Sequence, residues 1–129
     1  MTELKERSEM DPAFEWDLST LYKDDEGFEE ALKAVDASIA RTAAYEGTLN
    51  NAETIHAYLK ESSALSLEMN NIFTYASLRR TEDTRDSKAQ SMYGRAYAKY
   101  VEASAAAAFA EPEILSLPDE EINAFICND

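Results

Sequence analysis

A first amphipathic helix is predicted between Asp24 or Asp25 and Gly47. Its hydrophobic residues follow one another at intervals of four, three and four positions, which places them on one helical face. Either aspartate can accept the first backbone hydrogen bonds of the helix, and glycine readily adopts the left-handed conformation that ends one. The predicted face consists of Phe28, Leu32, Val35 and Ile39.

Two further helices follow the first. Asn50 with Glu53 three residues later resembles a capping box, so the second helix is expected to begin there and to run to about Leu78. The third is expected to begin at Asp83 or Thr84. The predicted faces are Ile55, Leu59, Leu65, Met69, Ile72, Phe73 and Ala76 in the second helix, and Met92, Tyr93, Ala96, Tyr97, Tyr100, Val101 and Ser104 in the third.

The beginning of the chain departs from this helical pattern. Residues 1–13 are polar and charged, and we expect them to be flexible. Phe14, Trp16 and Leu18 alternate with charged residues, which is typical of an extended segment with one buried side. The sequence therefore predicts an extended strap that lies against the helices.

The end of the chain contains two prolines that divide it. Pro112 is expected to end or kink the third helix because it lacks a backbone donor. Pro118 favours the first turn of a fourth helix, which has few residues to bury before the sequence breaks off. The predicted fold is all-α: an elongated up-down antiparallel bundle of three long helices plus the start of a fourth, with the extended N-terminal strap.

Composition excludes some classes of function but does not point to a catalytic or binding site. The 129 residues include 12 Lys and Arg against 26 Asp and Glu, a net charge of −14. This balance argues against nucleic-acid binding, which requires clustered basic residues. No stretch resembles a signal sequence or is apolar over the ~20 residues that span a bilayer, so the sequence predicts a cytoplasmic protein without membrane contact.

Candidate metal and catalytic groups are few. One His and one Cys cannot form a cysteine zinc site or a two-histidine zinc motif. Glu53 and His56 have the spacing of a di-iron carboxylate motif, but the second such pair is absent, so we expect a helix cap and a surface histidine instead. No catalytic, cofactor-binding or metal-binding residue is predicted. The acidic pairs at helix starts are expected to complement the helix dipoles: Asp24 and Asp25, Glu29 and Glu30, Glu120 and Glu121.

Three other features each allow two interpretations. Tyr93, Tyr97 and Tyr100 could form a stacking platform for a ligand, but an aromatic stripe at helical spacing is more often part of a core. Gly94 inside a helix costs about 1 kcal/mol relative to Ala, and the close approach of another helix would explain it. Cys127 is expected to be a small hydrophobic residue rather than a nucleophile.

Four segments each carry a recognisable pattern: Phe14–Leu18 with Leu21 and Tyr22, Tyr45–Leu49, Tyr75–Ala76 with Asp83–Thr84, and Phe109–Leu115. Taken in order, they resemble the N-terminal region of the oligoendopeptidase F family of zinc metallopeptidases. Each segment is short and weakly specific alone, but their order and spacing match the family over about residues 14–126. The first resembles the family's W-D-L-x-x-L-Y opening, the second its Y-x-G-x-L turn, the third its Y-A…D-T helix boundary and the fourth its F-x-x-P-E-I-L exit.

The resemblance implies that residues 14–129 are a truncated N-terminal helical domain that forms one wall of a peptide channel. The family's catalytic domain, which holds zinc through an H-E-x-x-H helix and hydrolyses oligopeptides, would then be absent. His56 is followed by Ala57 and Tyr58, so no zinc ligand or catalytic residue transfers to this chain. The chain alone is expected to be inactive, and its partner is expected to be the catalytic domain of the parent peptidase.

A different class of function remains open. The chain could be a free-standing helical module that binds a protein partner, or itself, through exposed apolar faces. Under the first hypothesis, a surface left without its partner should expose apolar side chains. We expect these around the third helix and residues 122–127.

Overall fold

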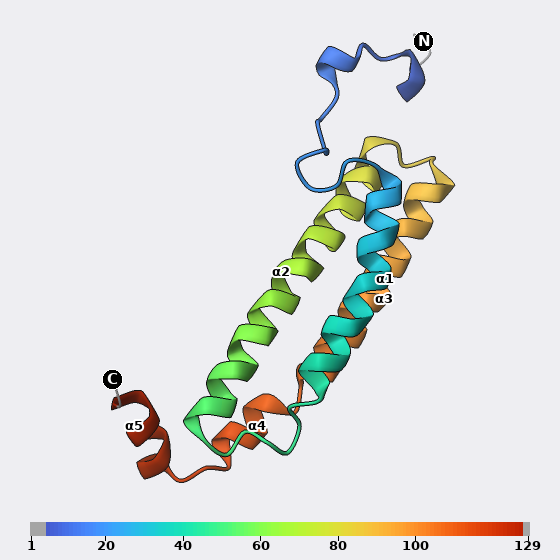
Figure 1. The fold of residues 1–129 in the computed structure, drawn as a ribbon. Coiled ribbons are helices and arrows are strands. Elements are labelled where there is room, and N and C mark those ends of the chain that lie inside the picture. The colour runs from blue at the N-terminus through green and yellow to red at the C-terminus, as the bar shows by residue number, and fades with distance from the viewer. Residues whose placement is uncertain (1–4, 128–129) are drawn as a thin grey trace.

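The structure is a computed structural model that describes residues 5–127, and these residues form helices and connecting segments without a β-strand (Figure 1). The predicted all-α class is confirmed. Two single turns of 3₁₀-helix, Arg7–Glu9 and Pro12–Phe14, precede the first long helix. The helices are α1 (Asp25–Ala43), α2 (Ala52–Glu82), α3 (Ser87–Ala107), α4 (Ala110–Leu115) and α5 (Asp119–Cys127).

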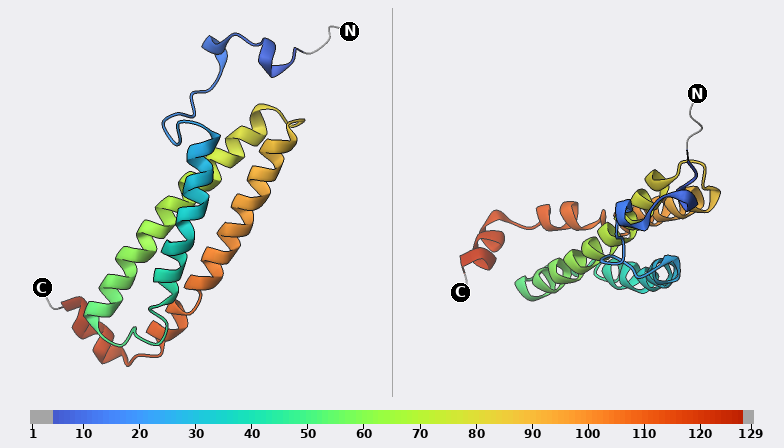
Figure 2. Two further views of the ribbon diagram at one scale, coloured as in Figure 1. Left: turned by 45° about the vertical axis from the view of Figure 1, so that its right-hand side comes forward. Right: turned by 90° about the horizontal axis from the view of Figure 1, so that it is seen from above.

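The three long helices pack side by side with alternating direction. Asp25 at the start of α1 contacts Arg79 near the end of α2, whereas Arg41 near the end of α1 contacts Glu61 in the first part of α2. Helix α3 then returns along α2. Figure 2 shows α1 lying over one side of the pair formed by α2 and α3. Helices α4 and α5 lie at the far end of the bundle, so no helix of the described chain covers the middle of the opposite side of that pair.

The core lies where α1 meets the α2–α3 pair. All four predicted hydrophobic residues of α1 are buried, which confirms its predicted face. Helix α3 contributes one methionine and two alanines to this core, and the small alanine side chains allow α3 to lie close to its neighbours. The buried cluster consists of Phe28, Leu32, Val35, Ile39, Leu65, Met69, Ile72, Tyr75, Ala76, Met92, Ala96 and Ala103.

The predicted helix boundaries differ from the observed ones by a few residues. Asp24 caps α1 as expected, with its carboxylate accepting the Gly27 N–H at 3.0 Å. The cap of α2 is Asn51, not Asn50, because the Asn51 side chain accepts the Thr54 N–H at 3.0 Å. Glu53 is therefore the second residue of the helix rather than the third, and the predicted capping box of Asn50 with Glu53 is wrong. Helix α1 ends at Ala43 and a turn follows, so Gly47 takes its left-handed conformation (φ 78°) in the turn rather than next to the helix.

Helix α2 continues to Glu82, one turn beyond the predicted end. The residue that caps α3 is Asp86, whose carboxylate accepts the N–H groups of Lys88 and Ala89, so the predicted start at Asp83 or Thr84 is wrong. Several carboxylates in this connection could cap a helix, and the sequence does not distinguish them. Asp83 instead accepts the backbone N–H of Arg85 in the turn that joins the two helices.

Pro112 breaks the third helix before the proline itself. The proline ring would collide with the carbonyl four residues earlier, at Ala108, and α3 ends at Ala107. A short helix, α4, then restarts at Ala110 with Pro112 in its first turn, where the missing donor costs little. The predicted fourth helix after Pro118 is present as α5.

The strap is only partly buried, which corrects the prediction for its first half. Phe14 and Trp16 are 80% and 72% exposed, whereas Leu18, Leu21 and Tyr22 pack against the core. Apolar packing against the core begins only at Leu18, and Phe14 and Trp16 before it stay exposed. Residues 1–4 of the predicted flexible segment lie outside the described residues, and the flexibility of residues 5–13 stays a prediction.

The hydrophobic face predicted for α3 is too broad. Met92 and Ala96 are buried and Tyr93 is half-buried, but Tyr97, Tyr100 and Val101 are 53%, 48% and 50% exposed. Ser104 is also exposed, as are Leu59 in α2 and Ile126 in α5. Exposed apolar side chains therefore occur both on α3 and among residues 122–127, as expected. The area of this apolar surface stays a prediction. Within residues 5–127, the structure contains no helix long and apolar enough to cross a membrane.

Candidate functional site

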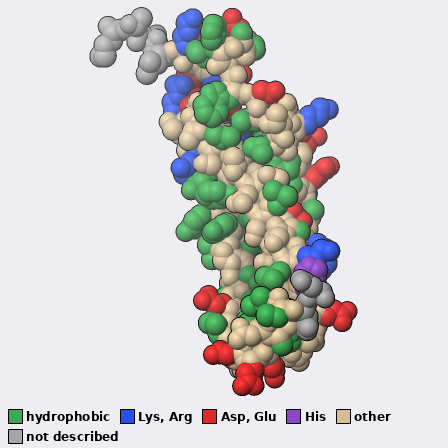
Figure 3. Space-filling model, turned by 90° about the vertical axis from the view of Figure 1, so that its left-hand side faces the viewer, with side chains coloured by type: hydrophobic (Ala, Val, Ile, Leu, Met, Phe, Trp, Pro, Cys, Tyr) green, Lys and Arg blue, Asp and Glu red, His purple; other side chains and the backbone are tan. Residues whose placement is uncertain are grey.

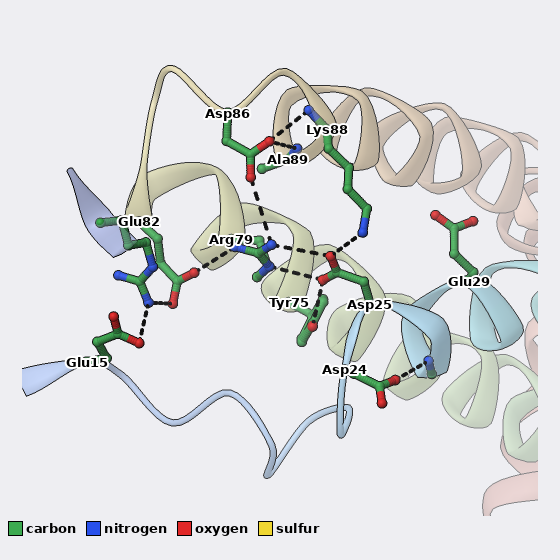
Figure 4. A network of polar contacts seen from close by, with 12 residues as sticks. Glu15, Asp24, Asp25, Glu29, Tyr75, Arg79, Glu82, Asp86, Lys88 and Ala89 are labelled. Atoms are coloured by element: carbon green, nitrogen blue, oxygen red, sulfur yellow. Dashed lines mark hydrogen bonds and ion pairs between the residues drawn. The ribbon is translucent and has the colours of Figure 1, made fainter. Parts of the chain in front are cut away.

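A network of charged side chains joins the three long helices at the strap end of the bundle (Figure 4). At its centre, the carboxylate of Asp25 accepts hydrogen bonds from Arg79 of α2 at 3.0 and 3.3 Å. Lys88 of α3 donates to the same carboxylate at 2.7 Å, and the hydroxyl of Tyr75 donates at 3.0 Å. One carboxylate at the start of α1 therefore holds donors from both neighbouring helices.

The network fixes the charge state of its members. The hydrogen bond from Arg79 holds the pKa of Asp25 well below its ordinary value, with Lys88 and Tyr75 acting in the same direction against the opposing effect of burial. Burial, followed by the neighbouring Asp25 carboxylate, raises the pKa of Tyr75 to about 12. Near neutral pH Asp25 is thus charged and Tyr75 neutral. Neither group has a pKa suited to proton transfer at that pH, which is typical of a structural ion-pair network.

Glu82 extends the network to the N-terminal segment. Its carboxylate accepts from Arg79 at 2.9 Å and from Arg7 at 2.7 Å. Arg7 also lies 3.5 Å from Glu15 of the strap, and Asp86 lies 3.8 Å from Arg79. These contacts connect the segment before α1, the end of α2 and the start of α3.

A second polar contact holds the opposite end of the bundle together. The carboxylate of Glu113 in α4 accepts the backbone N–H of Gly47 at 2.9 Å and that of Leu49 at 2.8 Å. Both donors lie in the connection between α1 and α2, where they have no helical partner. Glu113 therefore attaches α4 to this connection by two hydrogen bonds with a charged acceptor, which are stronger than neutral ones.

Aromatic side chains surround that contact. Tyr58 of α2 packs edge-on against Tyr45 and Phe109, with ring centroids 5.9 and 5.6 Å apart. Leu49 and Ala110 are buried in the same cluster. The cluster forms a small second core, separate from the main one, between the α1–α2 connection and the start of α4.

The four segments that resemble a known family meet at these two ends. Tyr22 of the strap packs edge-on against Tyr75, at 5.4 Å between ring centroids, and against Phe28 at 6.4 Å. The second and fourth segments meet through Glu113 and Phe109. Most of the residues that carry the resemblance thus contact distant parts of the chain, and these contacts lie at the two ends of the three-helix bundle.

Glu53 and His56 have the spacing of a di-iron motif but are not expected to bind a metal, and the described residues supply no partner ligands for them. Glu53 and His56 are both exposed in the first turns of α2, and no group of three or more potential ligands occurs between residues 5 and 127. Among the acidic pairs, Asp24 caps α1 and Glu29 pairs with Arg95 of α3 at 2.6 Å. Asp25 does more than complement the helix dipole, because it is the centre of the network above.

The tyrosine stripe of α3 is divided between core and surface. Tyr93 packs against Phe73 at 5.3 Å between ring centroids, and the Arg80 guanidinium lies 3.7 Å above the Tyr93 ring. Tyr100 reaches Phe73 at 5.9 Å but remains half exposed, as does Tyr97. Tyr93 therefore packs against the core, as predicted, whereas the prediction that Tyr97 belongs to the core is wrong.

Gly94 and Cys127 are both exposed. A Cβ atom added at Gly94 would have no atom of the described chain within 4 Å beyond its own helix backbone and chain neighbours, so no helix of this chain approaches it closely and that expectation is wrong. Cys127 lies near the end of α5 with its side chain exposed rather than packed. Neither residue contributes to a site formed by the described residues.

Comparison with known proteins connects this architecture to one family. Over 114 residues the chain is 33% identical to the chromosomal oligoendopeptidase F of Lactococcus lactis subsp. cremoris, a match that covers 87% of this chain and 19% of that protein. The plasmid-encoded oligoendopeptidase F of the same organism is 29% identical over 95% of this chain, and oligopeptidase PepF of Bacillus subtilis is 29% identical over 96%. The chain is therefore homologous to part of the oligoendopeptidase F proteins.

This chain spans about a fifth of the length of the oligoendopeptidases that it matches. That share is consistent with the N-terminal part of the family's polypeptide. No family model matches the chain, and no solved structure matches it. The Asp25 network and the Glu113 contact were not predicted from composition or spacing. The only sequence signal for them was the position of Tyr75 and Glu113 inside the segments that resemble the family.

Proposed function

We propose that this chain is the non-catalytic N-terminal helical region of an oligoendopeptidase F-like zinc metallopeptidase, and that it shapes the channel through which peptides reach the catalytic domain. The observation that supports this most directly is the match to oligoendopeptidases over nearly the whole chain but only a fifth of theirs. The segments that carry the resemblance are used for packing at the two ends of the bundle. On this proposal residues 14–129 are one domain, and the complete enzyme acts in the cytoplasm.

The zinc of the family does not fit the residues present here. A catalytic zinc requires three protein ligands converging on one point, and the whole sequence holds one His and one Cys. The described residues bring together no alternative set of three. Metal binding and water activation are therefore assigned to the remaining part of the family's polypeptide, and this chain contributes rigid helical surface.

Two assays test the proposal. The isolated chain, supplied with zinc and a quenched fluorescent peptide, should give no turnover; reproducible, chelator-sensitive hydrolysis would contradict the non-catalytic assignment. In the second assay this chain replaces the 114 aligned residues of the Lactococcus chromosomal enzyme. The resulting graft should hydrolyse peptides, and the same enzyme with those residues deleted should not. An inactive graft would count against a shared structural role.

A second candidate is a free-standing helical module that associates with itself or another protein. The exposed side chains of Tyr97, Tyr100 and Val101 favour it, because half-exposed aromatics are common at protein interfaces. Sedimentation velocity of the isolated chain distinguishes the two candidates. A tight, stable oligomer favours the module, whereas a monomer favours the peptidase region.

A further inference from the structure

One long side of the molecule is uncovered. We call it the open face: the side of the α2–α3 pair opposite α1, represented by Ser66, Asn70 and Phe73 of α2 and Tyr97, Tyr100 and Val101 of α3. The contact of Phe73 with Tyr100 places these two helix sides together. In Figure 3, large hydrophobic side chains gather along one edge of the middle of the molecule, and most charged side chains there lie along the other edge.

Arg80 lies over Tyr93 toward the strap end of this face, but α2 offers the face no charge between residues 62 and 78, although 29% of the residues of the chain are charged. Between residues 62 and 78, α2 has one charged residue, Glu68, and it accepts a hydrogen bond from Ser38 of α1 at 2.9 Å. In α3, Arg95 pairs with Glu29 and Lys99 pairs with Asp36, both of α1, and Glu102 pairs with the same Lys99. Glu68, Arg95 and Lys99 thus each contact α1 on the covered side.

A groove runs between the two helices on this face. Its volume is about 370 Å³, and buried side chains of Leu65, Met69 and Ala103 form its floor. Ser66, Asn70 and Tyr100 are among the residues that line it. The groove therefore offers an apolar base with uncharged hydrogen-bonding groups around it, which favours an occupant of the same character.

We propose that the open face is the surface on which the remaining part of the oligoendopeptidase F polypeptide packs, through an amphipathic helix whose contact side is apolar and uncharged. This rests on the proposed function, since the other four fifths of the family's length supply the occupant. A charged residue buried over the middle of this face would have no counter-ion from α2 or α3, and that cost disfavours a charged contact surface there.

The opposite side of the same helix pair shows what such an occupant requires. Helix α1 fills the groove there with Phe28, Leu32, Val35 and Ile39, at intervals of four, three and four residues. A helix with large apolar residues at these intervals buries one continuous stripe between two helices. The occupant of the open face is expected to carry a stripe of this kind.

The test uses the graft into the Lactococcus enzyme with two double variants. Tyr97→Glu with Val101→Glu places two negative charges on the open face at side chains that are already half exposed. The matched control, Ala37→Glu with Ala40→Glu, adds the same charges to exposed positions of α1. In the isolated chain, neither pair should change the thermal unfolding midpoint by more than a few degrees.

In the graft, the open-face variant should lose about tenfold or more of the peptide turnover and should unfold at a lower temperature, because the charges must be buried without partners. The control graft should match the unmodified one. An open-face variant as active and as stable as the control would overturn the inference while leaving the proposed function intact. An inactive unmodified graft would contradict the proposed function, and it would also contradict the inference, because the inference rests on that function.

A second copy of the chain is the competing occupant. Sedimentation velocity of the isolated chain over a range of concentrations detects it. A tight dimer that the open-face variant abolishes, and the α1 control does not, would overturn the inference in favour of self-association. A monomer at all concentrations supports it.

Discussion

Replacing Asp25 by Asn tests whether the network at the strap end stabilises the bundle. The substitution keeps the shape of the side chain but removes its charge and places an amide NH₂ group among donors. Asp25 accepts four hydrogen bonds, two from Arg79, one from Lys88 and one from Tyr75. At least one of these donors would then face another donor.

The expected loss is about 2 kcal/mol in the free energy of unfolding. Hydrogen bonds to a charged group contribute about 1.5–3 kcal/mol each, but the bonds to one carboxylate are not additive. Breaking a buried ion pair costs about 3–5 kcal/mol, and the side chain of Asp25 is 19% exposed, so solvent reduces that figure. For a chain of this length, 2 kcal/mol corresponds to a melting temperature lower by roughly 8 °C.

Urea unfolding followed by circular dichroism measures the difference, and Asp24→Asn is the matched control. Asn caps a helix as well as Asp, so the neighbouring substitution should change stability by less than about 0.5 kcal/mol. An Asp25→Asn protein as stable as this control at neutral pH would refute the reasoning, because it would mean that the network contributes nothing.

The pH dependence gives an independent check on the same network. The pKa of Asp25 in the folded protein lies below its ordinary value of 3.8, so its contribution is fully present above that pH. It is lost as the pH falls from there through the folded-state pKa. The difference between wild type and Asp25→Asn should therefore shrink in acid below about pH 4. Parallel curves over that range would contradict the assignment.

Three further experiments test other features of the structure. Glu113→Gln should cost about 1–2 kcal/mol in urea unfolding because two backbone donors lose a charged acceptor, whereas the exposed Glu111→Gln should cost nothing measurable. Tyr75 should ionise near pH 12 rather than 10 in an ultraviolet titration. The stability that the raised pKa represents should be constant below pH 10 and should be lost as the pH rises from 10 to about 12. Ionisation at the ordinary pKa of a tyrosine would contradict the hydrogen bond from Tyr75 to Asp25. Gly47→Ala should destabilise by about 1–2 kcal/mol because of its φ of 78°, while Gly94→Ala in an open helix position should stabilise by up to about 1 kcal/mol. Equal effects at the two glycines would contradict this reading of their backbones.

Hydrophobic periodicity predicted the buried face of α1 well and that of α3 poorly. All four residues predicted for α1 are buried because α1 lies in the groove between two helices and its whole face is covered. Helix α3 has an equally apolar side, but only Met92 and Ala96 of its predicted face are fully buried. Periodicity locates the centre of an apolar face, whereas the width that is buried depends on how many neighbours pack against it.

The sequence by itself determined the helical class, the α1 face, an aspartate cap at either Asp24 or Asp25 and the absence of a two-histidine zinc motif, since all of these depend on residue type or on local spacing. Tertiary structure decided the rest. Asp25 and Arg79 are 54 residues apart, and Gly47 and Glu113 are 66 apart. No local pattern distinguishes Asp25 from Asp24, because a carboxylate becomes the centre of a network only when helices from elsewhere in the chain bring donors to it. Packing likewise left Tyr97 on the open face, and periodicity alone had placed it in the core.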